Sequence, residues 1–224
     1  MKKAAVRDAS RLAIILDCDG VLIDSEGLAS RVEAELTREL GLPLSVDQAH
    51  DLFLGKTVAG VLDAIAQRTG SVPSPGFTYN WAFATAHAFL RELRPIPYLL
   101  PAVEELRRRG HRMAVASQSP LARVRFSLDV AGLAAFFGDR IFVTSMVPRP
   151  KPAPDVYLLA AARLGAAPGD CVVVEDSPAG AAAAAGAGMY SILYAPAEPV
   201  AVKRSGGVLR MTSMDQLPGL IAAL

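Results

Sequence analysis

The sequence predicts an α/β protein: a parallel sheet flanked by helices, interrupted by an all-helical insertion. From residue 101 onward, short apolar runs alternate with amphipathic helical patterns, which is typical of a parallel sheet. No strand pattern occurs between residues 25 and 94. A chain of 224 residues is long enough for one domain with such an insertion. We therefore expect a core formed by residues 1–24 and 95–224 and a helical cap formed by residues 25–94.

The first predicted strand is the apolar run 12–16, which ends at two acidic residues. Asp17 and Asp19 are two positions apart, so their side chains point the same way if the extended backbone continues. Open α/β sheets bind ligands at the carboxyl ends of their strands. Two neighbouring carboxylates favour a bound cation or a raised pKa on one of them. A calcium loop is excluded because it requires glycine at its sixth position, whereas Gly20 stands at the fourth.

The insertion contains four predicted helices. Apolar residues at a spacing of four, followed by glycine, predict the first helix over 25–40. Ser45 and Gln48 fit a capping box that begins the second helix, and Thr57 is in position to cap the third. A fourth helix is predicted over 77–93, before the stiff segment that returns the chain to the sheet. We expect hinges at the two ends of the insertion.

Helices and strands alternate in the rest of the chain. We expect helices over 101–109, from residue 120, over 154–164 and over 179–188, and strands over 113–116, 141–143, 171–174 and 190–193. Ser117 ends one of these strands and the pair Glu175 and Asp176 ends another, while Lys151 lies in a loop between two prolines. Because the carboxyl ends of parallel strands meet at one edge of a sheet, these residues are predicted to form one site with Asp17.

This set of residues resembles the motifs of the haloacid dehalogenase superfamily of phosphatases. The resemblance rests on the Asp-x-Asp-Gly sequence at 17–20, on Ser117, on Lys151 and on the acidic pair at 175–176. The flanking strings are similar to the branch that contains phosphoglycolate phosphatase, β-phosphoglucomutase and sugar-phosphate phosphatases. The similarity covers about residues 12 to 224 and is weaker in the insertion. It implies a Rossmann-like core and a mobile helical cap over the active site.

The resemblance also implies a mechanism and a metal. Asp17 would attack phosphorus and form an aspartyl-phosphate, and Asp19 would act as general acid and then as general base. The implied cofactor is Mg²⁺, held by the Asp17 carboxylate, the Asp19 carbonyl, the Asp176 carboxylate, substrate phosphate and water. Glu175 is expected to support this metal site from behind its direct ligands.

Substrate contacts are implied at two places. Ser117, Gln118 and Lys151 would bind the phosphoryl oxygens, with Lys151 offsetting the charge that accumulates in transfer. Gln118 stands where many relatives have asparagine, a departure that concerns its contact with substrate rather than the chemistry. In the cap, the loop at Gly55 and Lys56 would face the active site and contribute to substrate specificity. A nucleotide-binding loop is not expected there, because the required earlier glycine is missing and no strand precedes it.

Two alternatives to a phosphatase of small phosphorylated metabolites, such as sugar phosphates, stay open. The first is a β-phosphoglucomutase-like transfer, although the histidine that such mutases carry five residues after the aspartate corresponding to Asp24 is Ala29 here. The second is a non-catalytic protein that binds phosphorylated metabolites. Dehalogenase chemistry is not expected, because haloacid dehalogenases proper lack the second acid, here Asp19.

Composition excludes other classes. The net charge of +1 gives no bias toward nucleic acid, and no apolar run is long enough to span a bilayer. Cys18 and Cys171 each adjoin an apolar run, which favours two buried free thiols over a disulfide. A reducing cytoplasm fits these thiols. The resemblance implies a monomer whose partner is a small phosphorylated metabolite. Residues 1–10 are interpreted as a short leader.

Overall fold

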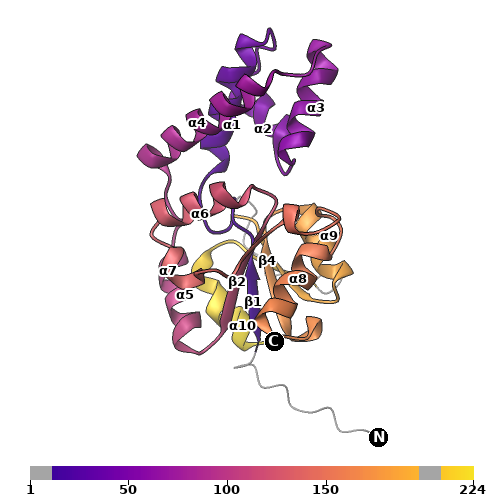
Figure 1. Cartoon of the computed structure of the whole chain (residues 1–224). Coiled ribbons are helices and arrows are strands. Elements are labelled where there is room, and N and C mark those ends of the chain that lie inside the picture. The colour runs from indigo at the N-terminus through magenta and orange to yellow at the C-terminus, as the bar shows by residue number, and fades with distance from the viewer. Residues whose placement is uncertain (1–11, 197–207) are drawn as a thin grey trace, which may run out of the picture.

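A six-stranded parallel sheet forms the centre of the molecule (Figure 1). The computed structural model describes residues 12–196 and 208–224, so the expected leader lies outside the described residues. The strand order is β3-β2-β1-β4-β5-β6. The strands are β1 Ala13–Leu16, β2 Arg112–Ser117, β3 Ile141–Val143, β4 Cys171–Glu175, β5 Tyr190–Tyr194 and β6 Val208–Met211. This order confirms the predicted Rossmann-like fold and places β1 between β2 and β4.

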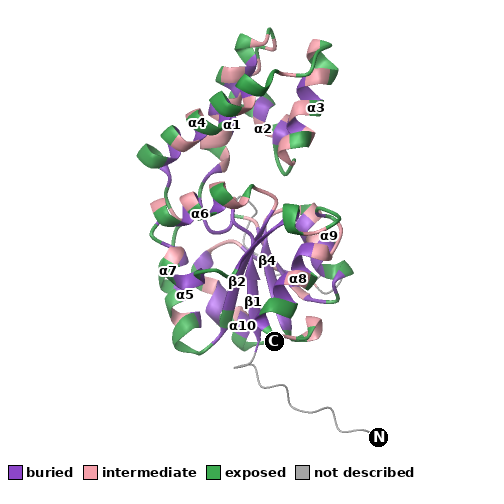
Figure 2. Ribbon diagram, in the orientation of Figure 1, coloured by how far each residue is buried: buried purple, intermediate pink, exposed green. Residues whose placement is uncertain are grey.

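Helices cover both faces of the sheet, which explains why its strands are continuous apolar runs. Ile14 and Leu16 pack on one face, and Ala13 and Ile15 pack on the other. The helices of the first face are α5 Leu99–Arg108, α6 Leu121–Val130, α7 Ala134–Phe137 and α10 Leu217–Ala222, and those of the second are α8 Asp155–Leu164 and α9 Pro178–Gly186. Figure 2 shows the strands buried between these layers.

The inserted segment consists of four helices with a hydrophobic core of their own. They are α1 Glu26–Glu39, α2 Val46–Phe53, α3 Val58–Thr69 and α4 Pro75–Glu92. Phe53, Ile65 and Trp81 are among the buried residues of this second core. The capping box of Ser45 and Gln48 is present, with both reciprocal hydrogen bonds, at the start of α2. The segment lies beyond the end of the sheet at which β1 leads into α1 (Figure 1).

Two chain segments join the helical segment to the sheet, and they lie side by side. Ile23 and Pro95 form an antiparallel bridge. The Asp24 amide donates to the Arg94 carbonyl at 2.9 Å, and the Ile96 amide donates to the Leu22 carbonyl at 3.1 Å. The connection is therefore a single paired strip rather than two independent linkers.

The structure adds elements that the sequence patterns did not reveal. The sheet has the edge strand β6 beyond the five predicted strands, and the single-turn helix α7 and the terminal helix α10 were not predicted. The fourth helix of the insertion begins at Pro75, two residues before the predicted start. Within the described residues, none of the helices is both long and apolar enough to cross a lipid bilayer.

Candidate active site

A cavity of about 840 Å³ opens between the carboxyl edge of the sheet and the helical segment. Its size lies within the roughly 300–1,000 Å³ that is usual for ligand pockets. The cavity is lined by every site residue expected from the sequence, namely Asp17, Asp19, Gly55, Lys56, Ser117, Gln118, Lys151, Glu175 and Asp176. Asp17, Ser117 and Asp176, up to about 160 positions apart in the chain, thus meet at one place because β1, β2 and β4 are neighbours in the sheet.

Strand register brings the three central tips to the same level. Leu16 is the partner of Val115 on one side and of Val174 on the other. The next residue, Asp17, donates its amide to the Val174 carbonyl at 2.9 Å. The chain then turns at Gly20, whose φ of +74° favours glycine and whose position leaves no room for a Cβ, since that atom would lie 1.8 Å from Asp176 Oδ2.

Lys151 is buried between two carboxylates. Its Nζ donates to Asp17 Oδ1 at 2.5 Å, to Glu175 Oε1 at 2.5 Å and to the Ala116 carbonyl at 3.0 Å. Its side chain is only 2% exposed. Burial alone would lower the pKa of Lys151, but Asp17 and Glu175 hold the pKa well above its ordinary value. The ammonium group therefore stays charged and compensates the acidic cluster.

Glu175 is fully engaged by donors. Its carboxylate accepts from the Tyr157 hydroxyl at 2.6 Å, from Ser177 Oγ at 2.8 Å and from the Asp176 amide at 3.1 Å, in addition to Lys151. Burial opposes ionisation, yet Lys151 and these donors lower the pKa of Glu175. Gly180 provides the space, because a Cβ there would lie 1.9 Å from the Glu175 carboxyl carbon. Glu175 thus orients Lys151 rather than facing the cavity with free oxygens.

Asp19 is held by donors from two parts of the chain. Its carboxylate accepts from Ser25 Oγ at 2.6 Å, from Ser119 Oγ at 2.7 Å and from Arg123 Nη2 at 3.0 Å. Burial would raise the pKa of Asp19, but Arg123 and the two hydroxyls outweigh it and lower the pKa. In this arrangement the ionised form of Asp19 is favoured.

The pKa values of Asp17 and Asp176 are raised, whereas that of Asp19 is lowered. Burial, augmented by Glu175 and opposed by Lys151, raises the pKa of Asp17 to about 8. Burial, together with the neighbouring charges of Asp17, Glu175 and Glu26, raises the pKa of Asp176 to about 9. Burial and neighbouring acidic groups therefore disfavour the ionised forms of both residues in the absence of a further cation.

This donor set fits a magnesium ion. No group of three or more His, Cys, Asp or Glu side chains among residues 12–196 and 208–224 is placed to hold a metal ion alone. Mg²⁺ requires no such cage, because it binds through one or two carboxylates and completes its shell with water and substrate phosphate. Asp17 and Asp176 offer two carboxyl groups in an acidic cluster that Lys151 compensates only in part, and a divalent cation would supply further positive charge.

The helical segment contributes to the cavity through the loop between α2 and α3. Gln118 Nε2 donates to the Gly55 carbonyl at 2.6 Å, so the loop after β2 contacts the loop of the insertion directly. Gly55 adopts a φ of +69°, which glycine accommodates without strain. Lys56 is exposed at the cavity rim. In the structure, Gln118 bridges the two parts of the molecule.

Several residues that hold the site together were not predicted from the sequence. Ser25, Ser119 and Arg123 hold Asp19, and Tyr157 holds Glu175. Arg123 lies in the first turn of the helix that follows Ser117, which is the one local signal available for it.

Cys18, between the two aspartates, is buried and free, and burial raises the pKa of its thiol well above the ordinary value. A thiolate nucleophile at Cys18 is therefore not supported.

A match to a protein-family model identifies the family of this chain. Residues 12–188 match the family described as haloacid dehalogenase-like hydrolase. The chain belongs to this family. Hexitol phosphatase B of Escherichia coli K12 is 35% identical over 184 residues, which cover 81% of this chain and 82% of that protein. The 6-phosphogluconate phosphatase of the same strain is 28% identical and covers 84% of this chain and 83% of that protein.

Solved structures agree with this assignment. A haloacid dehalogenase family hydrolase from Deinococcus radiodurans, with bound phosphate and sodium, is 34% identical to this haloacid dehalogenase-like hydrolase. Its TM-score is 0.73, and the match covers 96% of this chain and 97% of that chain. The similarity therefore includes the sheet and the helical segment together.

Proposed function

We propose that this hydrolase is a Mg²⁺-dependent phosphatase of small phosphorylated sugars or polyols and that it works through an aspartyl-phosphate on Asp17. The observation that carries the proposal is the joint position of Asp17, Asp19, Lys151 and Asp176 around one cavity. The names of the two Escherichia coli relatives, a hexitol phosphatase and a 6-phosphogluconate phosphatase, support the substrate class.

Two displacements at phosphorus make up the reaction. An oxygen of Asp17 attacks phosphorus, the bond to the sugar oxygen breaks, and Asp19 gives its proton to that leaving oxygen. Asp19, now a carboxylate, takes a proton from water, and the resulting hydroxide attacks the phosphorus of the aspartyl-phosphate. The bond to Asp17 breaks, which releases inorganic phosphate and restores the nucleophile. Splitting one displacement into two lowers each barrier.

The other predicted site residues have supporting roles in this proposal. Lys151 offsets the negative charge of Asp17 and of the transferred phosphoryl group. Ser117, which ends β2 and lines the cavity, would bind the phosphoryl oxygens. The Asp17 and Asp176 carboxylates and the Asp19 carbonyl would hold Mg²⁺, which supplies positive charge to the transferred group. Glu175 acts from behind by positioning Lys151.

Residues 25–94, which form the helical segment, are proposed to be a cap that excludes water from the active site and supplies substrate specificity. The paired strip at Asp24 and Arg94 is the proposed hinge, because it is where the segment is attached to the sheet. Gly55 and Lys56 lie in the cap loop that borders the cavity. Ala29, which also lines the cavity, offers no histidine for a mutase-like proton transfer.

The test is release of inorganic phosphate from sugar phosphates, phosphoglycolate and 6-phosphogluconate, with Mg²⁺ and with a chelator. We expect metal-dependent release by the wild-type protein and none by a folded Asp17→Asn variant. Asp63→Asn, on the exposed face of α3, is the matched control and retains activity. Conversion of β-glucose 1-phosphate to glucose 6-phosphate without release would establish the mutase instead, and normal rates in Asp17→Asn would remove the nucleophile.

A further inference from the structure

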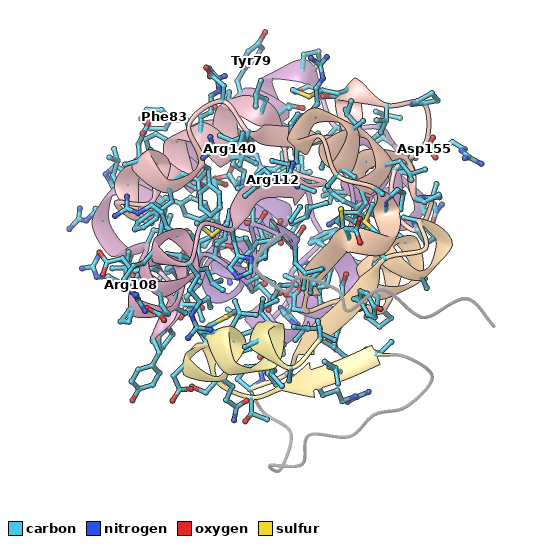
Figure 3. All side chains as sticks on the ribbon, turned by 90° about the horizontal axis from the view of Figure 1, so that it is seen from below. Tyr79, Phe83, Arg108, Arg112, Arg140 and Asp155 are labelled. Carbon is cyan, nitrogen blue, oxygen red and sulfur yellow. The ribbon has the colours of Figure 1, made fainter. Side chains whose placement is uncertain are left out.

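One face of α4 is turned toward the cavity. Trp81, Thr85 and Phe89 are four residues apart, so they lie on one side of the helix, and all three line the cavity. Tyr79 and Phe83 belong to the other side and are each 77% exposed. Figure 3 shows these two rings at the outer edge of the molecule, pointing away from its centre. The cavity side of α4 is thus distinct from its solvent side.

Thr85 carries an unsatisfied polar atom on this cavity side. The residue is 5% exposed, and its Oγ1 has no hydrogen-bond partner within the part of the chain that the structure describes. A buried hydroxyl without a partner destabilises a protein unless water or a ligand satisfies it. Arg123 Nε, in another residue that lines the cavity, is unpartnered in the same sense. Two residues that line the cavity thus each carry a buried polar atom without a partner among the described residues.

A carboxylate approaches the same region from α1. Glu26, Ala29, Ser30 and Glu33 share one side of this helix and line the cavity. No side-chain hydrogen bond or ion pair of Glu33 is found among the described residues, whereas its neighbour Arg31 pairs with Glu92 at 2.7 Å. Burial raises the pKa of Glu33 to about 7, and Arg123 opposes that rise. Glu33 therefore presents free acceptor oxygens to the cavity.

These groups complement a neutral, hydroxylated substrate. Carboxylate oxygens accept hydrogen bonds from sugar hydroxyls, and the threonine hydroxyl both donates and accepts. Trp81, which lines the cavity and is 8% exposed, offers apolar surface to the carbon-bound hydrogens of a carbohydrate chain. Above the pKa of Glu33, which is about 7, a substrate with a carboxylate at this position would be repelled by the ionised Glu33, because like charges in a desolvated site interact strongly.

We infer that Glu33 and Thr85 form a specificity subsite that binds the hydroxyl groups of a phosphorylated polyol or neutral sugar and discriminates against substrates with a terminal carboxylate. The inference rests on the proposed phosphatase function and extends it, because it names the substrate class and the residues that select it. Neither residue contacts the reacting atoms in this scheme, so both are specificity-determining rather than catalytic.

The experiment compares two substrates that differ at one carbon. Sorbitol 6-phosphate ends in a hydroxymethyl group, where 6-phosphogluconate ends in a carboxylate. We expect wild-type protein to favour sorbitol 6-phosphate in kcat/KM, and we expect Glu33→Gln to reduce that preference about 10-fold, chiefly through KM, since a charge-assisted hydrogen bond becomes a neutral one. Glu35→Gln, on the exposed side of α1, is the matched control and keeps the wild-type preference.

Thr85→Val provides an independent readout, because valine keeps the shape and removes the hydroxyl. We expect kcat/KM on sorbitol 6-phosphate to fall about 2- to 10-fold. The melting temperature of the free protein should rise by about 2–4 °C, as an unsatisfied buried hydroxyl is lost. A purely structural threonine would lower both quantities.

The outcomes separate the two proposals. Phosphate release with the same substrate preference in wild type, Glu33→Gln and Glu35→Gln would overturn the subsite and leave the phosphatase standing. Absence of release by the folded wild-type protein from both substrates and from p-nitrophenyl phosphate would overturn the phosphatase and the subsite together. A wild-type preference for 6-phosphogluconate would also overturn the subsite as drawn.

Discussion

Replacing Lys151 by methionine removes the positive charge between Asp17 and Glu175 while keeping a long side chain. Both ion pairs are short, at 2.5 Å, and the lysine side chain is 2% exposed. Removing one partner of a buried ion pair typically costs about 3–5 kcal/mol, because the remaining charge is left uncompensated. We therefore expect Lys151→Met to lower the free energy of unfolding of the metal-free protein by about this amount at pH 8.

The loss should be smaller at pH 5, and the sign follows from the pKa shifts. The raised pKa of Lys151 means that its stabilisation is fully present below the unfolded pKa near 10.5, hence throughout pH 5–8. The lowered pKa of Glu175 means that its stabilisation is present above its unfolded pKa of about 4.5 and fades as the pH falls through the folded pKa. Without Lys151, burial raises the pKa of Glu175. Between pH 4.5 and this raised pKa, Glu175 is protonated in the folded variant but ionised in the unfolded chain and in the folded wild type. Over this range the stability lost by the variant therefore grows by about 1.4 kcal/mol for each pH unit.

The assay is urea unfolding followed by far-ultraviolet circular dichroism at pH 5 and pH 8, with a chelator present. Lys56→Met, which removes an exposed lysine at the cavity rim, should change the free energy of unfolding by less than about 0.5 kcal/mol. The double variant Lys151→Met/Glu175→Gln should recover part of the loss, because the unpaired charge is gone. A loss below about 1 kcal/mol for Lys151→Met, or an equal loss at both pH values, would refute the argument.

Three further predictions follow from other contacts. Gly180→Ala should lower stability by about 2 kcal/mol or more in thermal unfolding, because its Cβ would overlap the Glu175 carboxyl, whereas Gly219→Ala, with no atom within 4 Å, should not. Glu33→Gln should raise the free energy of unfolding by on the order of 2 kcal/mol at pH 8 but leave it unchanged at pH 4. The reason is that wild-type stability falls as the pH rises from the unfolded pKa of Glu33, about 4.5, to its folded pKa of about 7. Equal effects at both pH values would contradict this. Gln118→Ala should raise KM about 2- to 10-fold through loss of the contact with Gly55, and an unchanged KM would show that this contact does not support closure.

The sheet and the cluster of strand ends were accessible from sequence because the signals are local. A buried parallel strand is an uninterrupted apolar run, and the polar residue that ends it, such as Ser117 or Glu175, is visible by inspection. Topology rules then bring the ends together without any knowledge of distances. Strand β6 gave a weaker signal: Leu209 and Met211 are buried while Val208 and Arg210 are half-buried, which is the short alternation of an edge strand.

The partners of the site residues were not accessible, because they depend on long-range placement. The resemblance implied that Lys151 binds the phosphoryl oxygens, but not that its Nζ also contacts Asp17, Glu175 and the Ala116 carbonyl. Tyr157 has the spacing of an ordinary core residue of α8, and only packing against β4 reveals that its hydroxyl supports Glu175. Helical periodicity identifies which face of a helix is buried, but not which polar atom that face meets.

The position of Asp19 connects the chemistry to the attachment of the helical segment. The proposed role of general acid requires a proton on Asp19, yet its three donors favour the carboxylate. Ser25 immediately precedes α1, whereas Ser119 and Arg123 belong to the segment after β2. A displacement of α1 relative to α6 would therefore withdraw the Ser25 hydroxyl and leave the other two donors in place. The loss of a donor to the charged form raises the pKa of a carboxyl group. Movement of the helical segment would therefore raise the pKa of Asp19 and favour its protonated, acidic form. The two roles of Asp19 in the proposed reaction would then correspond to two positions of α1.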